Sequence, residues 1–230
     1  MVKLFHHPFC PHSRFVRLVC AEIGVELELV EERAWERRRE FLKLNPAATT
    51  PVMSDDKGPA IPGAGVIAEY LDETRGVTLG DRRLMPERVD ARIEVRRLLD
   101  WFNLTFFAEV SEPLAREKVY KRFMKPAEGG GSPDAASIRA ARSNVRYHLH
   151  YIGHLIGRRK WLAGDQLTYA DLAAAAHLSC VDYLGDAPWS EDEAAREWYA
   201  RIKSRPSFRA LLAEKVAGTL PALHYANLDF

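Results

Sequence analysis

The feature that most constrains the fold is a change in sequence pattern near residue 80. The first eighty residues alternate short strand and helix signals, whereas the pattern from Pro86 onward is helical throughout. A chain of 230 residues is long enough for two small domains that share an interface. We therefore expect an α/β domain at 1–80, a linker at 81–86, an all-helical domain at 87–220 and a C-terminal tail at 221–230.

The α/β half is expected to have the element order βαβαββα. Residues Pro11 to Ile23 have helical apolar spacing that ends at Gly24, and residues 25–29 alternate like a half-buried strand. A charged helix is expected at 33–44. The other expected elements are strands at 2–5, 51–53 and 60–61 and a helix that contains 66–71.

In the helical half, two long helices and one capping signal stand out. A helix is expected at 86–113, because proline is well suited to a first helical position, and another is expected to follow Ser132-Pro133 and reach about residue 156. Thr168 and Asp171 have the spacing of a capping box, in which each side chain binds the other residue's backbone amide.

Composition narrows the function classes. No stretch approaches the ~18 consecutive apolar residues that a membrane span needs. The net charge of +1 by itself argues neither for nor against nucleic acid or a membrane, and we expect neither as a partner. Cys10, Cys20 and Cys180 form an odd set without a CxxC pair, which suits a reducing compartment, so we expect a cytoplasmic protein.

Three segments resemble the glutathione S-transferase family. Residues 7–18, with Cys10-Pro11, resemble the first turn of its glutaredoxin-like branch, and residues 45–52 resemble its Asn-Pro…Val-Pro segment. Residues 167–172 are similar to its Ser/Thr-x-x-Asp box. The resemblance implies a thioredoxin-like N-terminal domain followed by an all-α domain. It also implies a cis peptide bond before Pro51 and a glutathione contact from the backbone of the neighbouring Thr50.

The same resemblance exposes a departure from the family pattern at residues 60–71. In the family, an acidic residue and a serine just before the next helix hold the γ-glutamyl end of glutathione. Their places fall here on Gly63 and Ala64, whose side chains cannot form hydrogen bonds. We therefore expect a vestigial glutathione site with no bound cofactor and no metal. Its residues are Cys10, Thr50, Pro51, Gly63 and Ala64.

Cys10 allows two interpretations. At a helix N-terminus, unpaired amides and the helix dipole stabilise a thiolate, as a thiol-transferase nucleophile requires. A glutathione-dependent transferase or thiol-disulfide oxidoreductase using Cys10 is therefore the alternative function. The competing interpretation is an inherited cysteine in a disused pocket, and the missing clamp favours it. An enzyme acting on another ligand in the remodelled cleft is a third option.

A narrower resemblance concerns the Gly-Ala substitution, the full length and the closing residues 223–230. These features resemble the glutathione-transferase-like division proteins of alphaproteobacteria, which bind the polymer-forming GTPase FtsZ. That resemblance implies a non-catalytic adaptor that forms a homodimer, binds the FtsZ polymer, regulates filament organisation and works at the division site.

Two segments are the candidate partner-binding surfaces. In the charged segment 31–40, Trp35 stands close to Arg37 and Arg38, a combination typical of interface hot spots. The alternative is that Trp35 packs inward with Phe41.

The second candidate is the tail, which is richer in aromatic and apolar residues than a disordered tail would be. It either contacts a partner or folds back on the body, and the two are compatible. Its candidate contact residues are Tyr225, Asn227, Leu228, Asp229 and Phe230.

Overall fold

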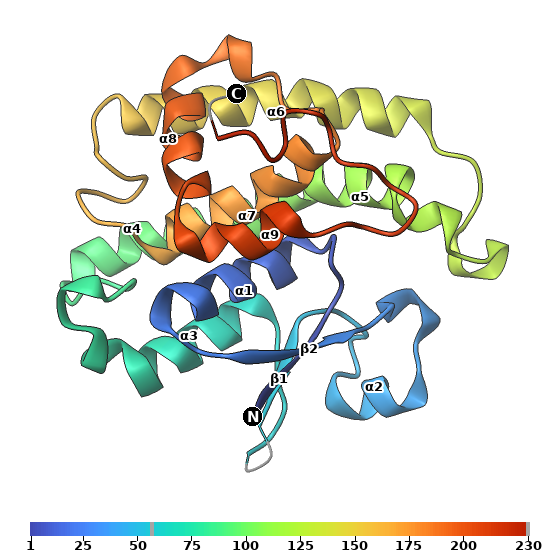
Figure 1. The fold of residues 1–230 in the computed structure, drawn as a ribbon, viewed down its shortest axis with the longest axis horizontal. Helices are drawn as coiled ribbons and strands as arrows, with labels where there is room; N and C mark the ends of the chain where they lie inside the picture. Colours follow the sequence, from blue (N-terminus) through green and yellow to red (C-terminus); the bar gives the residue numbers. More distant parts are fainter. Residues whose placement is uncertain (56–57, 229–230) are drawn as a thin grey trace.

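A computed structural model describes residues 1–55 and 58–228 of the chain. The N-terminal part is a mixed sheet with strand order β2-β1-β3-β4, in which β1 runs parallel to β2 and antiparallel to β3. The strands are β1 (Val2–His6), β2 (Leu27–Glu31), β3 (Val52–Ser54) and β4 (Ile61–Pro62). Helices α1 (Pro11–Ile23) and α3 (Ala64–Arg75) lie between this sheet and the helical part (Figure 1).

Helix α1 has the bounds that its sequence predicts. Pro11 occupies the first turn, where a missing amide proton costs nothing, and Gly24 ends the helix with a φ of 74°. Strand β2 instead begins two residues later than predicted, at Leu27. Its parallel pairing with β1, from Val2 opposite Leu27 onward, determines this register.

The helix predicted at 33–44 is wrong. The chain forms a short 3₁₀ turn, η1 (Ala34–Glu36), and then α2 (Arg39–Leu44). Between them Arg37 adopts a left-handed φ of 46°. Glu32, buried after β2, requires a cation, and Arg38 turns back to form an ion pair with it. The change in chain direction at Arg37 therefore interrupts the predicted helix.

The C-terminal part is helical, with α7 at its centre (Figure 1). No helix in the described part of the chain is long and apolar enough to cross a membrane. The elements are η2 (Gly76–Arg82), α4 (Val89–Asp100), the π-helical η3 (Trp101–Ser111), α5 (Glu112–Lys118), η4 (Tyr120–Arg122), η5 (Pro126–Glu128), α6 (Ala135–Ile156), α7 (Tyr169–Tyr183), η6 (Trp189–Glu191), α8 (Glu193–Lys203), η7 (Pro206–Phe208) and α9 (Arg209–Ala213).

The prediction of a helix at 86–113 is wrong at both ends. The helix begins at Val89 and continues through Pro113 as α4, η3 and α5. The register ahead of Pro113 is π-helical, and the backbone N of Glu112 donates to the carbonyl oxygen of Phe107, five residues earlier. The Nδ2 of Asn144 in α6 donates to the carbonyl oxygen of Glu109 at 3.1 Å, so a neighbouring helix supports this turn.

The predicted cap of α6 is displaced by a residue or two. Asp134, not Ser132 or Pro133, is the N-cap, and its carboxylate accepts a hydrogen bond from the backbone N of Ala136 at 2.9 Å. An aspartate is the better cap because its negative carboxylate also interacts favourably with the positive end of the helix dipole.

The predicted capping box at the start of α7 is confirmed, and its aspartate does more than cap. The buried Asp171 accepts hydrogen bonds from the backbone N of Thr168 at 3.0 Å and of Leu162 at 2.9 Å. Trp198 of α8 donates its Nε1 proton to the same carboxylate at 3.1 Å. Asp171 therefore joins α7 to the preceding loop and to α8.

Replacing this carboxylate tests its structural role. We expect Asp171→Ala to lower the free energy of unfolding by about 3 kcal/mol, because several buried donors lose their acceptor. Thermal and urea unfolding measure the change. Asp165→Ala, at an exposed position in the same loop, is the matched control and should change stability little. Equal stability of the two variants would contradict this role.

Candidate functional site

A cavity of about 1150 Å³ lies between the sheet domain and the helical domain. The sheet side contributes the loop after β1, the segment before Pro51, the start of α3 and η1. The helical side contributes the end of α4 and residues of η3, α5, η4 and η5. The aromatic lining residues are His7, His12, Trp35, Phe107 and Tyr120.

Cys10 lies in this cavity at the N-cap of α1, as predicted from the sequence. Its thiol is 3.6 Å from the carbonyl oxygen of Thr50, toward which it can donate a weak hydrogen bond. The ring of His12 is fixed at the other side, with its Nε2 2.9 Å from the carbonyl oxygen of Asn103 in η3. Cys10 and His12 are therefore held together where the two domains meet.

This arrangement lowers the pKa of Cys10 to about 7. Burial alone would raise the pKa, but hydrogen bonding to His12 and its positive charge act more strongly in the opposite direction. The nearby side chains of Ser13 and Thr50 also lower the pKa of Cys10. The pKa of His12 is raised, despite its burial, by the same contact with Cys10.

The start of α3 forms the opposite end of the predicted glutathione site. Gly63, with a φ of 92°, is the N-cap, and its backbone N donates to the carbonyl oxygen of Pro51 at 3.0 Å. The Thr50–Pro51 peptide bond is cis, as the family resemblance implies. A Cβ atom on Gly63 would meet no other heavy atom within 4 Å. Gly63 and Ala64 both line the cavity, and neither has a side chain that can form hydrogen bonds.

The structure contradicts the interpretation in which Trp35 packs inward with Phe41. Its indole is half-buried in the cavity wall, with ring centroids 5.4 Å from His7 and 5.2 Å from Tyr120. Phe41 packs on Phe5 instead. Because η1 replaces the predicted helix, Trp35 points to the helical domain and links the two sides of the cleft.

The two arginines beside Trp35 have different roles. Arg37 is exposed on the cavity rim and, among residues 1–55 and 58–228, no ion pair satisfies its guanidinium. Arg38 is also exposed, but it is engaged in the ion pair with the buried Glu32. Of the two, Arg37 is therefore the one whose charge is free to meet a partner.

The tail folds back on the body, anchored by Tyr225. This side chain is 1% exposed, and its hydroxyl accepts a hydrogen bond from Arg14 at 3.2 Å. Tyr225 therefore fastens the tail internally and offers no surface to a partner. Asn227 and Leu228 are exposed, whereas the predicted contacts Asp229 and Phe230 lie outside the described residues.

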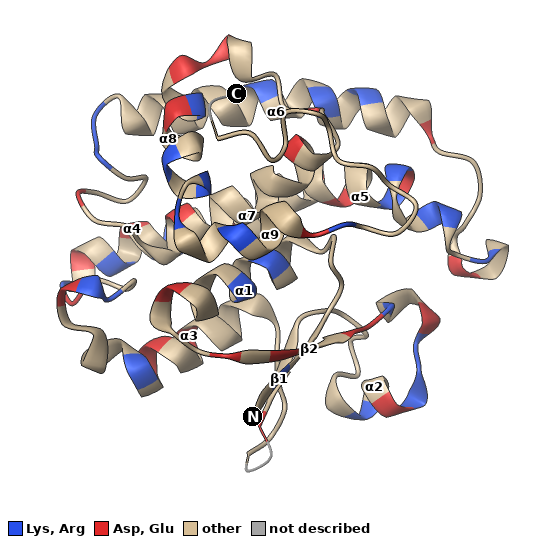
Figure 2. Cartoon of the chain, in the orientation of Figure 1, with Lys and Arg blue, Asp and Glu red and all other residues tan. Residues whose placement is uncertain are grey.

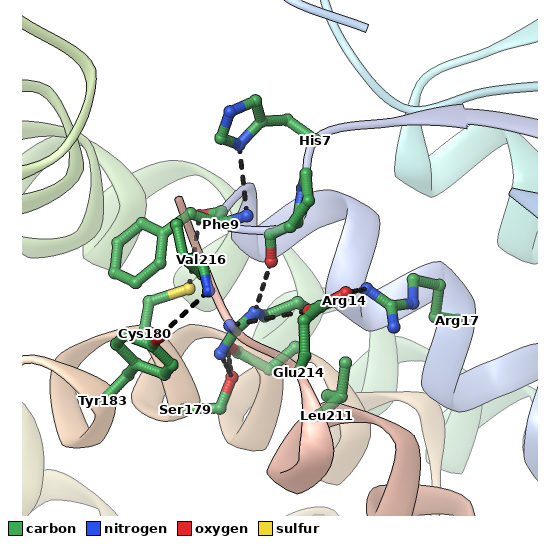
Figure 3. Close-up of polar contacts among 12 residues, drawn as sticks. His7, Phe9, Arg14, Arg17, Ser179, Cys180, Tyr183, Leu211, Glu214 and Val216 are labelled. Atoms are coloured by element: carbon green, nitrogen blue, oxygen red, sulfur yellow. Dashed lines mark hydrogen bonds and ion pairs between the residues drawn. The ribbon is translucent and has the colours of Figure 1, made fainter. Parts of the chain in front are cut away.

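Arg14 is the residue that sequence reasoning missed most clearly. Its guanidinium is fully buried among the loop after β1, α7 and the tail, where it donates to the carbonyl oxygen of Pro8 at 2.8 Å and to Ser179 Oγ at 2.9 Å (Figure 3). Arg17, one turn further along α1, forms a two-pronged ion pair with Glu214 at 2.8 and 2.9 Å. The sequence did hold a signal for these buried charges, since the two arginines lie three residues apart on an otherwise apolar face of the helix.

Tyr120 and Phe123, also missed, follow α5. Tyr120 contacts both His7 and Trp35, and the guanidinium of Arg33 lies over the ring of Phe123 at 5.4 Å. Nothing local in their sequence distinguishes them from core aromatics. No group of three or more metal-binding side chains is close enough to hold an ion within the described ranges.

The low pKa of Cys10 can be tested by alkylation with iodoacetamide, followed residue by residue by mass spectrometry. We expect the reaction at Cys10 to have its midpoint near pH 7, because below that pH the thiol is protonated. His12→Leu should move the midpoint upward, since the main groups that oppose the effect of burial on the pKa of Cys10 are then lost. Cys20 and Cys180, whose pKa values burial raises to about 12 and about 11, are internal controls. A midpoint near 9 in the unaltered protein would contradict the proposed pairing.

Comparison with known proteins gives the chain its family. The model of the N-terminal glutathione S-transferase domain matches residues 4–79, and that of the C-terminal domain matches residues 116–215. FtsZ-localized protein A of Caulobacter vibrioides is 41% identical over 230 residues, which cover 99% of this chain and 97% of that protein.

Two solved structures are similar over their full length. A glutathione S-transferase from Sinorhizobium meliloti has a TM-score of 0.98 and 54% identity, with each chain covered completely. FzlA from C. crescentus has a TM-score of 0.91 and 40% identity, over 100% of this chain and 99% of that one. Together with the matched domains, these similarities show that the chain belongs to the glutathione S-transferase family.

Proposed function

We propose that this chain is a non-catalytic adaptor that binds FtsZ filaments as a homodimer and regulates their organisation at the bacterial division site. The observation that carries the proposal is the lining of the cleft at the start of α3, where Gly63 and Ala64 offer no side chain that can form hydrogen bonds. The family resemblance is what places the glutathione clamp at these two positions. Similarity to FtsZ-localized protein A, 41% over nearly the full chain, supports the choice of partner.

The missing clamp has a large effect on the expected glutathione affinity. A hydrogen bond to a charged group contributes about 1.5–3 kcal/mol, so two lost contacts weaken binding by roughly 3–6 kcal/mol. This corresponds to about two to four orders of magnitude in the dissociation constant. A glutathione site with a dissociation constant of about 1 μM would therefore weaken to about 0.1–10 mM.

The rim of the cleft offers a surface for protein binding. Trp35 stands half-exposed against Tyr120, close in sequence to Arg37, whose guanidinium has no ion-pair partner within residues 1–55 and 58–228. The backbone of Arg37 is held in the left-handed region, a conformation that costs a non-glycine residue energy and is concentrated at functional sites. An aromatic residue next to an arginine is the composition of an interface hot spot.

A homodimer would place two such surfaces on one particle. Apolar side chains are exposed along α3, α4 and η3, which supports this face as the contact between two copies. They are Val66, Val89, Ile93 and Leu104. Two-fold symmetry would then give each dimer two identical filament sites, so that it could bridge or bend filaments through avidity.

The alternative is a glutathione-dependent transferase or thiol-disulfide oxidoreductase that uses Cys10. Two observations favour it: the lowered pKa of Cys10, and the name of the relative from Sinorhizobium meliloti, a glutathione S-transferase. The two functions differ in their response to Cys10→Ser, which should abolish the activity of an enzyme and leave filament binding by an adaptor nearly unchanged.

Substitution at Trp35 tests the adaptor. We expect Trp35→Ala to weaken co-sedimentation with GTP-assembled FtsZ filaments at least tenfold, or about 1.4 kcal/mol, because the central aromatic contact is lost. Trp35→Phe should retain most of the binding. Arg39→Ala, at an exposed position outside the cavity lining, is the matched control. Failure of the unaltered protein to sediment with filaments would refute the proposed function.

A further inference from the structure

We propose that His177 in α7 is a positioning residue that sets the reactivity of the Cys10 thiol. It acts through Asn103 and His12, and it does not itself line the cavity. The inference goes beyond the adaptor function and does not depend on it, since it concerns the chemistry of the cleft. It means that a buried residue of the helical domain determines how readily a thiol of the sheet domain reacts.

The carbonyl oxygen of Asn103 determines which nitrogen of His12 faces the thiol. It lies 2.9 Å from Nε2 of His12, and because a carbonyl only accepts, this nitrogen carries a proton. Nδ1 is then the nitrogen left to bond with Cys10. When Nδ1 takes the Cys10 proton, the imidazolium donates on both sides, to the thiolate and to the carbonyl. Burial lowers the pKa of His12, but its contacts with Cys10 and with this carbonyl raise it more strongly.

His177 holds the side chain of the same asparagine. Its Nε2 is 3.2 Å from Oδ1 of Asn103, and its Nδ1 is 2.9 Å from Oγ of Ser111. Since the amide oxygen only accepts, Nε2 donates, and in the neutral ring Nδ1 accepts the hydroxyl proton of Ser111. Asn103 lies near the start of the π-helical η3 and Ser111 at its end. One imidazole ring therefore fixes both ends of the segment whose carbonyl orients His12.

The surroundings of His177 keep its ring neutral. The side chain is fully buried, and burial holds its pKa well below the usual range, with the charges of His12 and His148 acting in the same direction. Between Asp171 and Asp182, α7 carries no Lys, Arg, Asp or Glu, and this stretch is tan in Figure 2. The ring of His12 stands edge to face with His177, with 5.2 Å between the centroids. A neutral His177 can therefore lie next to a charged His12 without electrostatic repulsion.

The other titratable side chains around Cys10 stay neutral when the thiol titrates. They are Tyr120 of η4 and Cys180 of α7. Burial raises the pKa of Cys180 to about 11 and holds that of Tyr120 well above its usual range. The pH profile of the Cys10 reaction therefore reports on its contact with His12, which is the contact that His177 is proposed to position.

His148 of α6 holds η3 in a similar way and provides a matched control. Its Nδ1 accepts a hydrogen bond from Nε1 of Trp101 at 3.1 Å, and its Nε2 is 3.0 Å from a carboxylate oxygen of Glu109. His148 and His177 are both fully buried, and both pack on the ring of Phe106. Neither Trp101 nor Glu109 lines the cavity. The two histidines thus resemble each other in burial and packing and differ in their connection to the thiol.

Alkylation by iodoacetamide tests the inference, because the Cys10 thiolate displaces iodide far faster than the thiol does. We expect His177→Phe to raise the midpoint pH of the reaction by about one unit, which slows alkylation at pH 7 roughly fivefold. His177→Gln, whose amide can donate to Asn103 and accept from Ser111, should restore the midpoint. Asn103→Ala, the second variant, should raise it in the same direction. His148→Phe should lower the unfolding temperature about as much as His177→Phe and leave the midpoint unchanged.

A double variant separates positioning from a general loss of packing. If His177 acts through His12, adding His177→Phe to His12→Leu should move the midpoint no further. A further shift in the double variant, or an equal shift in His148→Phe, would overturn the inference. An unchanged midpoint in Asn103→Ala would also overturn it, and this variant decides the matter if His177→Phe does not fold. Filament binding enters none of these measurements, so the adaptor function is tested separately.

Discussion

The buried guanidinium of Arg14 is the interaction on which the rest of the structure depends. A charge removed from water must be given hydrogen-bond partners, and Arg14 finds them in three places that are distant in sequence. These partners are Pro8 in the loop after β1, Ser179 in α7 and Tyr225 in the C-terminal tail. The carboxylate of Glu214 lies 3.8 Å from the guanidinium. Arg14 therefore positions the loop after β1, the domain interface and the C-terminal tail together. A change in the tail can thus affect the cleft through this side chain.

Local sequence signals were sufficient to predict the elements whose ends are determined by their own residues. Helix α1 was predicted to the residue because Pro11 and Gly24 mark its ends, and the capping box of Asp171 was read from its spacing. The segment around Trp35 was mispredicted because a distant contact overrides its helical periodicity. Glu32 becomes buried only when β2 pairs with β1, and Arg38 then turns back to neutralise it.

The candidate site was predictable on its sheet side and not on its helical side. Cys10 and Gly63 were found because they stand in motifs of the family, whose backbone geometry the structure retains. Tyr120 contacts Trp35 across the cleft although the two residues lie far apart in the sequence. No short-range sequence pattern could have predicted that contact. The exposure of Leu220 likewise depends on contacts between the segment after α9 and the rest of the helical domain. The sequence of that segment alone does not reveal them.

This family member keeps the cleft, and we propose that it no longer binds glutathione there. Isothermal titration of the unaltered protein with reduced glutathione tests it most directly. We expect no saturable heat at micromolar glutathione, because neither Gly63 nor Ala64 offers a hydrogen-bonding side chain at the clamp position. Binding with a micromolar dissociation constant, reduced in Cys10→Ser, would contradict the account and establish the enzyme in its place.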